Sequence, residues 1–108
     1  MTLNEYQNFT DTTRDIEKTP LVLYTSLGLC GEAGEVADKI KKAIRDADCI
    51  ISGTRREEIA KEIGDVLWYV AQLSRDLGYE LEEIAQTNVQ KLNDRLKRGV
   101  IGGSGDNR

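Results

Sequence analysis

Histidine is absent from the 108 residues of this sequence, which removes imidazole as a general base, as an activator of a nucleophile and as a metal ligand. Any chemistry must therefore rest on carboxylates, lysines or bound water. Cysteine occurs only at Cys30 and Cys49, without the CxxC spacing of zinc or redox sites. We expect both to be buried, reduced thiols with no chemical role.

Long apolar runs are also lacking. No stretch approaches the roughly 20 apolar residues that cross a bilayer, and the N-terminal MTLNEYQNF has neither the basic nor the apolar region of a signal peptide. A cytoplasmic protein with no membrane partner is therefore expected. The net charge of -4 also argues against binding to a nucleic-acid polymer, which requires a basic surface.

Strand-like alternation is nearly absent, whereas apolar residues recur at helical spacing through most of the chain. The fold class is therefore predicted to be all-α, with helices over residues 3–18, 20–45, 54–77 and 81–98. Short connections between four helices favour an antiparallel bundle. We expect residues 1–101 to form one helical domain with a thin core, and residues 102–108 to form a glycine-rich tail.

The expected helix ends follow from capping residues. Thr2 with Glu5 and Thr54 with Glu57 have the spacing of capping boxes. Thr19 before the single proline, Pro20, is typical of a helix start, and Gly78 and Gly99 are expected to end the third and fourth helices.

A short pattern, E-x-G-[ED]-V, occurs twice, at residues 32–36 and 62–66. Residues three apart are neighbours on a helix, so each copy directs two carboxylates to one place beside an apolar face. If the two apolar faces pack together, the four acids meet along one edge of the interface. These acids are Glu32, Glu35, Glu62 and Asp65.

Four converging negative charges repel one another unless a cation lies between them. Oxygen ligands without histidine favour Mg²⁺, or Mn²⁺ in its place, over zinc, and magnesium commonly completes its shell with substrate phosphates. Gly34 and Gly64 are expected to allow a close approach of the two helices, because glycine inside a helix costs about 1 kcal/mol relative to alanine. The alternative is that both acidic pairs are solvated helix surfaces. A di-iron carboxylate bundle is rejected because it requires Glu-x-x-His pairs.

The segments LGLCGEAGEVADKIKK and EIGDVLWYVAQLSRDLG resemble the MazG-like all-α nucleoside triphosphate pyrophosphohydrolases. The resemblance implies the MazG-like fold and hydrolysis of an NTP or dNTP to the monophosphate and pyrophosphate. It also implies magnesium bound by Glu32, Glu35, Glu62 and Asp65. We predict Glu35 to be the catalytic base that accepts a proton from the attacking water. The thin core, together with the oligomeric assembly that the resemblance to this family implies, predicts a homodimer or homotetramer.

Other residues are predicted to bind substrate. Lys39 and Lys42 share the helical face of the acids and would neutralise the phosphates, unless they are simply exposed lysines that support the helix. By resemblance, Tyr69 would contact the sugar or base, with simple packing as the alternative. Trp68 is interpreted as a packing or interface residue.

Asn88, Lys91 and Arg95 form a polar stripe on the fourth helix. The resemblance implies that Lys91 and Arg95 bind phosphate or sugar, and that Gln7 contacts the base. Arg108 in the tail is available for a phosphate if the tail closes over the substrate, and terminal disorder is the alternative. Two rival functions remain: a phosphoribosyl-ATP pyrophosphatase-like enzyme, and a non-catalytic helical module that senses nucleotide or binds a partner.

Overall fold

The computed structural model describes residues 1–15 and 21–108, and this part of the chain contains helices and no strands. The helices are α1 (Leu3–Thr12), α2 (Leu21–Asp46), α3 (Thr54–Asp76) and α4 (Leu81–Lys97). The predicted all-α class is confirmed, and the described residues contain four helices where four were predicted. No helix among the described residues has the length and apolar character that crossing a bilayer requires.

The first helix begins as predicted and ends earlier. Thr2 accepts a hydrogen bond from the Glu5 amide at 3.0 Å, and Glu5 accepts one from the Thr2 amide, so the capping box is confirmed. The helix stops at Thr12 because the hydroxyls of Thr10, Thr12 and Thr13 all donate to backbone carbonyls three residues earlier, which competes with further helix formation. The predicted start at Thr19 and Pro20 lies outside the described residues.

Helix α3 begins differently from the prediction. Its N-cap is Gly53, in the left-handed region at φ 54°, and no side chain caps the helix, so the predicted capping box of Thr54 and Glu57 is wrong. The ends of α3 and α4 follow the prediction, with Gly78 at φ 82° and Gly99 at φ 70° just after them. Both conformations are strained for residues with a side chain.

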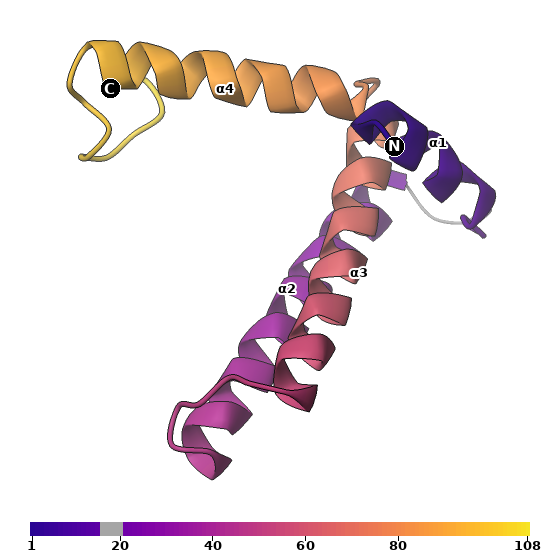
Figure 1. Cartoon of the computed structure of the whole chain (residues 1–108). Coiled ribbons are helices and arrows are strands. Elements are labelled where there is room, and N and C mark those ends of the chain that lie inside the picture. The colour runs from indigo at the N-terminus through magenta and orange to yellow at the C-terminus, as the bar shows by residue number, and fades with distance from the viewer. Residues whose placement is uncertain (16–20) are drawn as a thin grey trace.

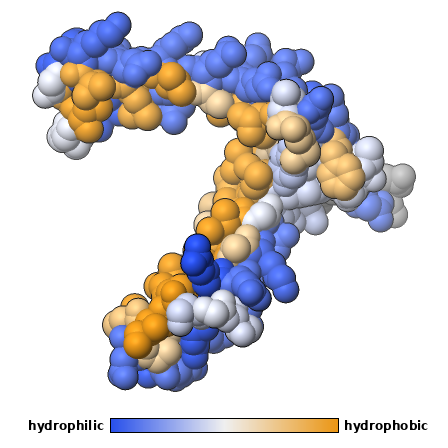
Figure 2. Space-filling model, in the orientation of Figure 1, coloured by the Kyte–Doolittle hydropathy of each residue, from blue (hydrophilic) through white to orange (hydrophobic). Residues whose placement is uncertain are grey.

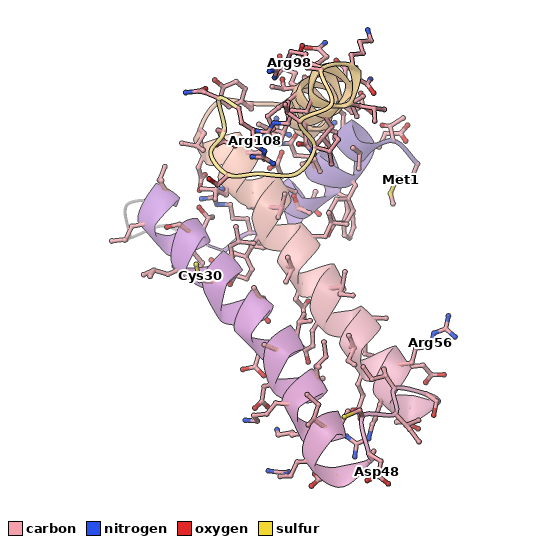
Figure 3. All side chains as sticks on the ribbon, turned by 90° about the vertical axis from the view of Figure 1, so that its left-hand side faces the viewer. Met1, Cys30, Asp48, Arg56, Arg98 and Arg108 are labelled. Atoms are coloured by element: carbon pink, nitrogen blue, oxygen red, sulfur yellow. The ribbon has the colours of Figure 1, made fainter. Side chains whose placement is uncertain are left out.

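The arrangement of the helices differs from a closed bundle. Helices α2 and α3 run antiparallel and pack along their length, joined by a turn at Asp48 (Figures 1 and 3). Helix α1 packs on the end of α3, where α4 leaves at a steep angle (Figure 1). Among the described residues, α4 makes no contact with α2. The radius of gyration is 16.8 Å, whereas a compact chain of this length has about 13 Å.

The predicted antiparallel arrangement thus holds for α2 and α3, whereas α4 projects from this pair as an arm. The hydrogen bonds of Gln7 to Tyr79 and Leu81 hold the start of α4, and among the described residues α4 makes no contact with α2 that would fold it back along the α2–α3 pair. Figure 2 shows apolar side chains along the inner side of the angle between α4 and the α2–α3 pair. The most exposed large apolar side chains of α2, α3 and α4 include Leu27, Ile44, Ile63, Val89 and Leu96. We call this surface the inner apolar face.

The junction is held by buried polar groups. Arg14 forms a salt bridge of 2.6 Å with Asp76, whose side chain is only 2% exposed. Thr25 of α2 donates to Asp76 at 2.9 Å, and Arg14 donates to Gln72 at 2.6 Å. One carboxylate therefore ties α2, α3 and the segment after α1 together.

Cys30 and Cys49 are free, but both are exposed, so the expectation of burial is wrong. Cys49 lies in the turn between α2 and α3, where it has a φ of 65°.

Candidate metal centre

The packing of α2 against α3 brings three carboxylates together. One oxygen from each of Glu32, Glu62 and Asp65 lies within 4.8 Å of the others. Glu62 and Asp65 are three apart on α3, so they present their side chains on the same side of the helix. Glu32 faces them from α2. The pairing of E-x-G-[ED]-V segments expected from the sequence thus places these three acids in one cluster, which we call the acidic cluster.

The electrostatics of the acidic cluster are unfavourable without a cation. Burial raises the pKa of Glu32 above its ordinary value, and the charges of Asp65, Glu62 and Glu35 raise it further. Lys39 is the one cation whose ion pair reaches this cluster in the described part of the chain, with its Nζ 3.4 Å from Glu62 Oε1. A single lysine cannot balance three carboxylates, so the cluster retains affinity for a further positive charge.

The donor set fits a hard divalent ion. All three ligands are carboxylate oxygens, and two oxygens on opposite sides of a magnesium ion lie about 4.2 Å apart. The observed separation of up to 4.8 Å is slightly larger. Small side-chain rotations would therefore bring the three carboxylates to bonding distance.

Glu35, the fourth predicted ligand and the predicted base, lies outside this cluster. Its side chain is exposed on α2, although its charge still contributes to the raised pKa of Glu32. Its two predicted roles stay predictions.

A hollow of about 360 Å³ opens beside the cluster and is lined by Glu32, Asp65, Trp68 and Tyr69. Burial raises the pKa of the Tyr69 hydroxyl, and the neighbouring Tyr24, Glu32 and Asp65 raise it further. Tyr69 therefore lies beside the acidic cluster, and its contact with the sugar or base stays a prediction. Trp68, interpreted from the sequence as a packing or interface residue, packs on Tyr69 and also lines the hollow. The one available signal was its spacing of three from Asp65, which puts both on one helical face.

Gly28 is the glycine that allows α3 to approach α2 closely, through the ring of Tyr69. The prediction that Gly34 and Gly64 allow this close approach is wrong. A Cβ atom added at Gly34 or Gly64 would meet no described atom within 4 Å. At Gly28 it would lie 2.0 Å from Cε1 of Tyr69. The ring of Tyr69 thus crosses the backbone of α2 at Gly28, which fixes its position beside the acidic cluster.

Lys42 is exposed and pairs with Asp38 at 2.7 Å. Together with Lys39, Arg55 and Glu58 it lines a second, smaller hollow of about 180 Å³. Arg55 was not predicted as a site residue, and its position depends on the packing of α3 on α2.

Gln7 is completely buried and lies at the junction of the helices. Its amide nitrogen donates to the carbonyls of Ala71 and Tyr79 at 3.1 and 3.0 Å, and its oxygen accepts from the Leu81 amide at 2.9 Å. Gln7 therefore holds α1 to the α3–α4 turn, in place of the base contact that the sequence predicted.

The three predicted residues on α4 lie apart from the acidic cluster. Asn88 and Lys91 line a groove of about 620 Å³ on α4. Arg95 is buried, and its Nη2 donates to the Asp106 carbonyl at 2.7 Å. Lys91 also pairs with Asp106, at 3.5 Å. Because α4 projects away from the α2–α3 pair (Figure 1) and makes no contact with α2 among the described residues, these three residues do not line the hollow beside the carboxylates.

The tail from 102 to 108 folds back on α4. Arg108 lies inside the loop that the tail makes (Figure 3) and donates to the carbonyls of Ile101, Gly102 and Gly105. The sequence predicted that this arginine is available for a phosphate. In the structure its guanidinium group is already bound to backbone carbonyls of the tail and of Ile101.

The fold and the cluster define the class of the protein: an all-α protein with a carboxylate site suited to a divalent cation between two antiparallel helices. The family model of the MazG nucleotide pyrophosphohydrolase domain matches residues 22–100, and the chain belongs to this family. A curated relative, "Gene 37 protein" of Mycobacterium phage L5, is 52% identical over 85 residues, which cover 79% of this chain and 75% of the relative. No solved structure matches the chain.

Proposed function

We propose that the protein is a magnesium-dependent nucleoside triphosphate pyrophosphohydrolase that converts an NTP or dNTP to the monophosphate and pyrophosphate. The convergence of Glu32, Glu62 and Asp65 within 4.8 Å carries this proposal. The family assignment adds a small-molecule nucleotide as the substrate. Mn²⁺ suits the same oxygen ligands and is expected to replace Mg²⁺.

The residues around the cluster have distinct roles in this proposal. Glu32, Glu62 and Asp65 hold the metal, which when bound neutralises phosphate charge and acidifies a water. Glu35, exposed beside the cluster, accepts the proton of the water that attacks the phosphorus. The bond that breaks joins the α-phosphorus to the bridging oxygen, which leaves with pyrophosphate. Lys39 and Lys42 offset the charge of the phosphates.

We also propose that the working protein is a homodimer or a homotetramer, and that a second copy covers the inner apolar face. Helix α4 leaves this face uncovered, since in the described part of the chain it makes no contact with α2 and projects away from the α2–α3 pair (Figure 1). A second copy would bury the exposed apolar side chains and complete the missing layer of the bundle. It would also bring Lys91 of one protomer toward the acidic cluster of another.

Product analysis tests the activity. We would incubate the protein with the eight common NTPs and dNTPs and with phosphoribosyl-ATP, in Mg²⁺ or Mn²⁺, and separate the products by anion exchange. Monophosphate and pyrophosphate from an NTP or dNTP are expected. Orthophosphate with diphosphate would contradict the proposal, as would turnover of phosphoribosyl-ATP alone. Tight binding of nucleotide without turnover would favour the sensing module.

The assembly is tested by sedimentation equilibrium and by subunit complementation. A dimer or tetramer is expected at micromolar concentration, and a monomer would contradict the proposed assembly. Asp65→Asn and Lys91→Ala are each expected to be inactive alone. Mixed and refolded together, they are expected to regain part of the activity, because some sites then combine an intact Asp65 with an intact Lys91. Activity that stays absent in the mixture would show that each site lies within one chain.

A further inference from the structure

Trp68 is held at the edge of the hollow by two contacts. Its indole N–H donates to the hydroxyl of Thr13 at 2.7 Å, which ties it to the segment after α1. Its ring meets that of Tyr69 edge to face, with centroids 5.0 Å apart and planes at 77°. The hydrogen bond and the ring contact together fix the orientation of the indole. The side chain is nevertheless only half-buried, and it borders the hollow that Glu32 and Asp65 also line.

The position of Trp68 relative to the acidic cluster suits one part of a nucleotide. Asp65 and Trp68 are three residues apart on α3, so Trp68 follows the cluster by almost one helical turn, about 4.5 Å along the axis. Phosphates bound at the carboxylates leave the nucleoside to extend along the hollow. An oriented indole with an accessible surface is the group on which proteins stack nucleobases, and every base has a face that can stack.

We propose that Trp68 is a substrate-binding residue that stacks on the nucleobase while the phosphates are held at the acidic cluster. This inference rests on the proposed function, since it places the phosphates of the substrate at Glu32, Glu62 and Asp65. Thr13 acts as a positioning residue, because it accepts the indole N–H and holds the ring toward the hollow. Stacking of this kind tolerates any base and favours purines, which have the larger ring surface.

The chain contains one tryptophan, so its intrinsic fluorescence reports on this residue alone. We would titrate the protein with two probes in Mg²⁺: the α,β-methylene analogue of a purine deoxynucleoside triphosphate, and inorganic tripolyphosphate, which has no base. Calorimetry is expected to show that both probes bind. Only the nucleotide analogue is expected to quench the fluorescence. Equal quenching by tripolyphosphate would overturn the stacking.

Variants separate stacking from structural support. Trp68→Leu is expected to weaken binding of the nucleotide analogue by about 10-fold to 100-fold, while tripolyphosphate binds as before. Trp68→Phe keeps an aromatic face and is expected to retain most of the affinity. Circular dichroism shows whether each variant folds. Equal losses for the two probes in Trp68→Leu, or no loss for either, would overturn the inference.

The outcomes also distinguish this inference from the proposed function. If wild-type protein binds neither probe in Mg²⁺, the proposed function fails and the inference fails with it. If tripolyphosphate binds and the nucleotide analogue binds equally well with Trp68→Leu, the inference alone fails. If the fluorescence responds to protein concentration and not to nucleotide, Trp68 packs against another copy, which also overturns the inference.

Discussion

The close contact between Gly28 and Tyr69 predicts opposite effects for two alanine substitutions on one helix. A Cβ atom at Gly28 would lie 2.0 Å from Cε1 and 2.4 Å from Cζ of the tyrosine ring. Carbon atoms in contact lie about 3.5–4.0 Å apart, so the ring must move by roughly 1.5 Å. The centroids of the Trp68 and Tyr24 rings lie 5.0 and 6.4 Å from the centroid of that ring, which restricts the movement. At Gly31, a Cβ atom would meet no described atom within 4 Å.

The expected magnitudes follow from these contacts. Replacing a helical glycine by alanine stabilises a helix by about 1 kcal/mol, whereas inserting an atom into a filled space costs about 1–3 kcal/mol. Gly31→Ala is therefore expected to raise the melting temperature. Gly28→Ala should be less stable than Gly31→Ala by about 1–3 kcal/mol, and each kcal/mol corresponds to about 4–8 °C in a domain of this size.

Thermal unfolding followed by circular dichroism measures this difference, with Gly64→Ala as a second control on the other helix. In a Tyr69→Leu background, which removes the ring, Gly28→Ala should become as favourable as Gly31→Ala. Equal rises in melting temperature for Gly28→Ala and Gly31→Ala in the wild-type background would refute the close contact. The position assigned to Tyr69 beside the acidic cluster would then be wrong as well.

Three further predictions concern charged groups. Because the pKa of Glu32 is raised in the fold, its protonation favours the folded state below its ordinary pKa, and this contribution is lost as the pH rises through the folded value. Glu32→Gln should therefore raise the melting temperature of metal-free protein at pH 7 but not at pH 4, and should abolish the stabilisation by Mg²⁺. Asp76→Ala leaves the half-buried Arg14 without its carboxylate, and should cost about 3 kcal/mol in urea unfolding, at the low end for a buried pair. The charge of Lys91 holds the pKa of Asp106 below its ordinary value; in an NMR titration, Lys91→Ala should raise that pKa.

The helices and the acidic cluster could be predicted from the sequence because the apolar residues and the acids that define them recur at helical spacing. Periodic apolar residues predicted all four helices, and the two copies of E-x-G-[ED]-V predicted the side of α2 that faces α3. The orientation of Trp68 and the start of α3 did not follow from the sequence, because each depends on a contact or backbone conformation that spacing does not determine. Trp68 is oriented by Thr13, 55 residues away in the sequence.

The glycines show the same limit. Gly34 and Gly64 carry the repeated pattern, yet the ring that needs space crosses the helix at Gly28. Gln7 shows a second limit: the sequence predicted a base contact, but the side chain is buried, where it bonds the carbonyls of Ala71 and Tyr79 and the amide of Leu81. The projecting α4 did not follow from the sequence, because apolar stripes show that a helix must be covered, and not what covers it.

Binding of Mn²⁺, followed by electron paramagnetic resonance, tests the metal centre most directly. Wild-type protein and Glu57→Gln, which removes an exposed acid in the first turn of α3, should bind the ion equally and release it to excess Mg²⁺. Glu62→Gln should bind it at least about 10-fold more weakly, a difference of about 1.4 kcal/mol, with an unchanged circular dichroism spectrum. Equal binding by Glu62→Gln and Glu57→Gln would contradict the assignment of the acidic cluster as the metal site.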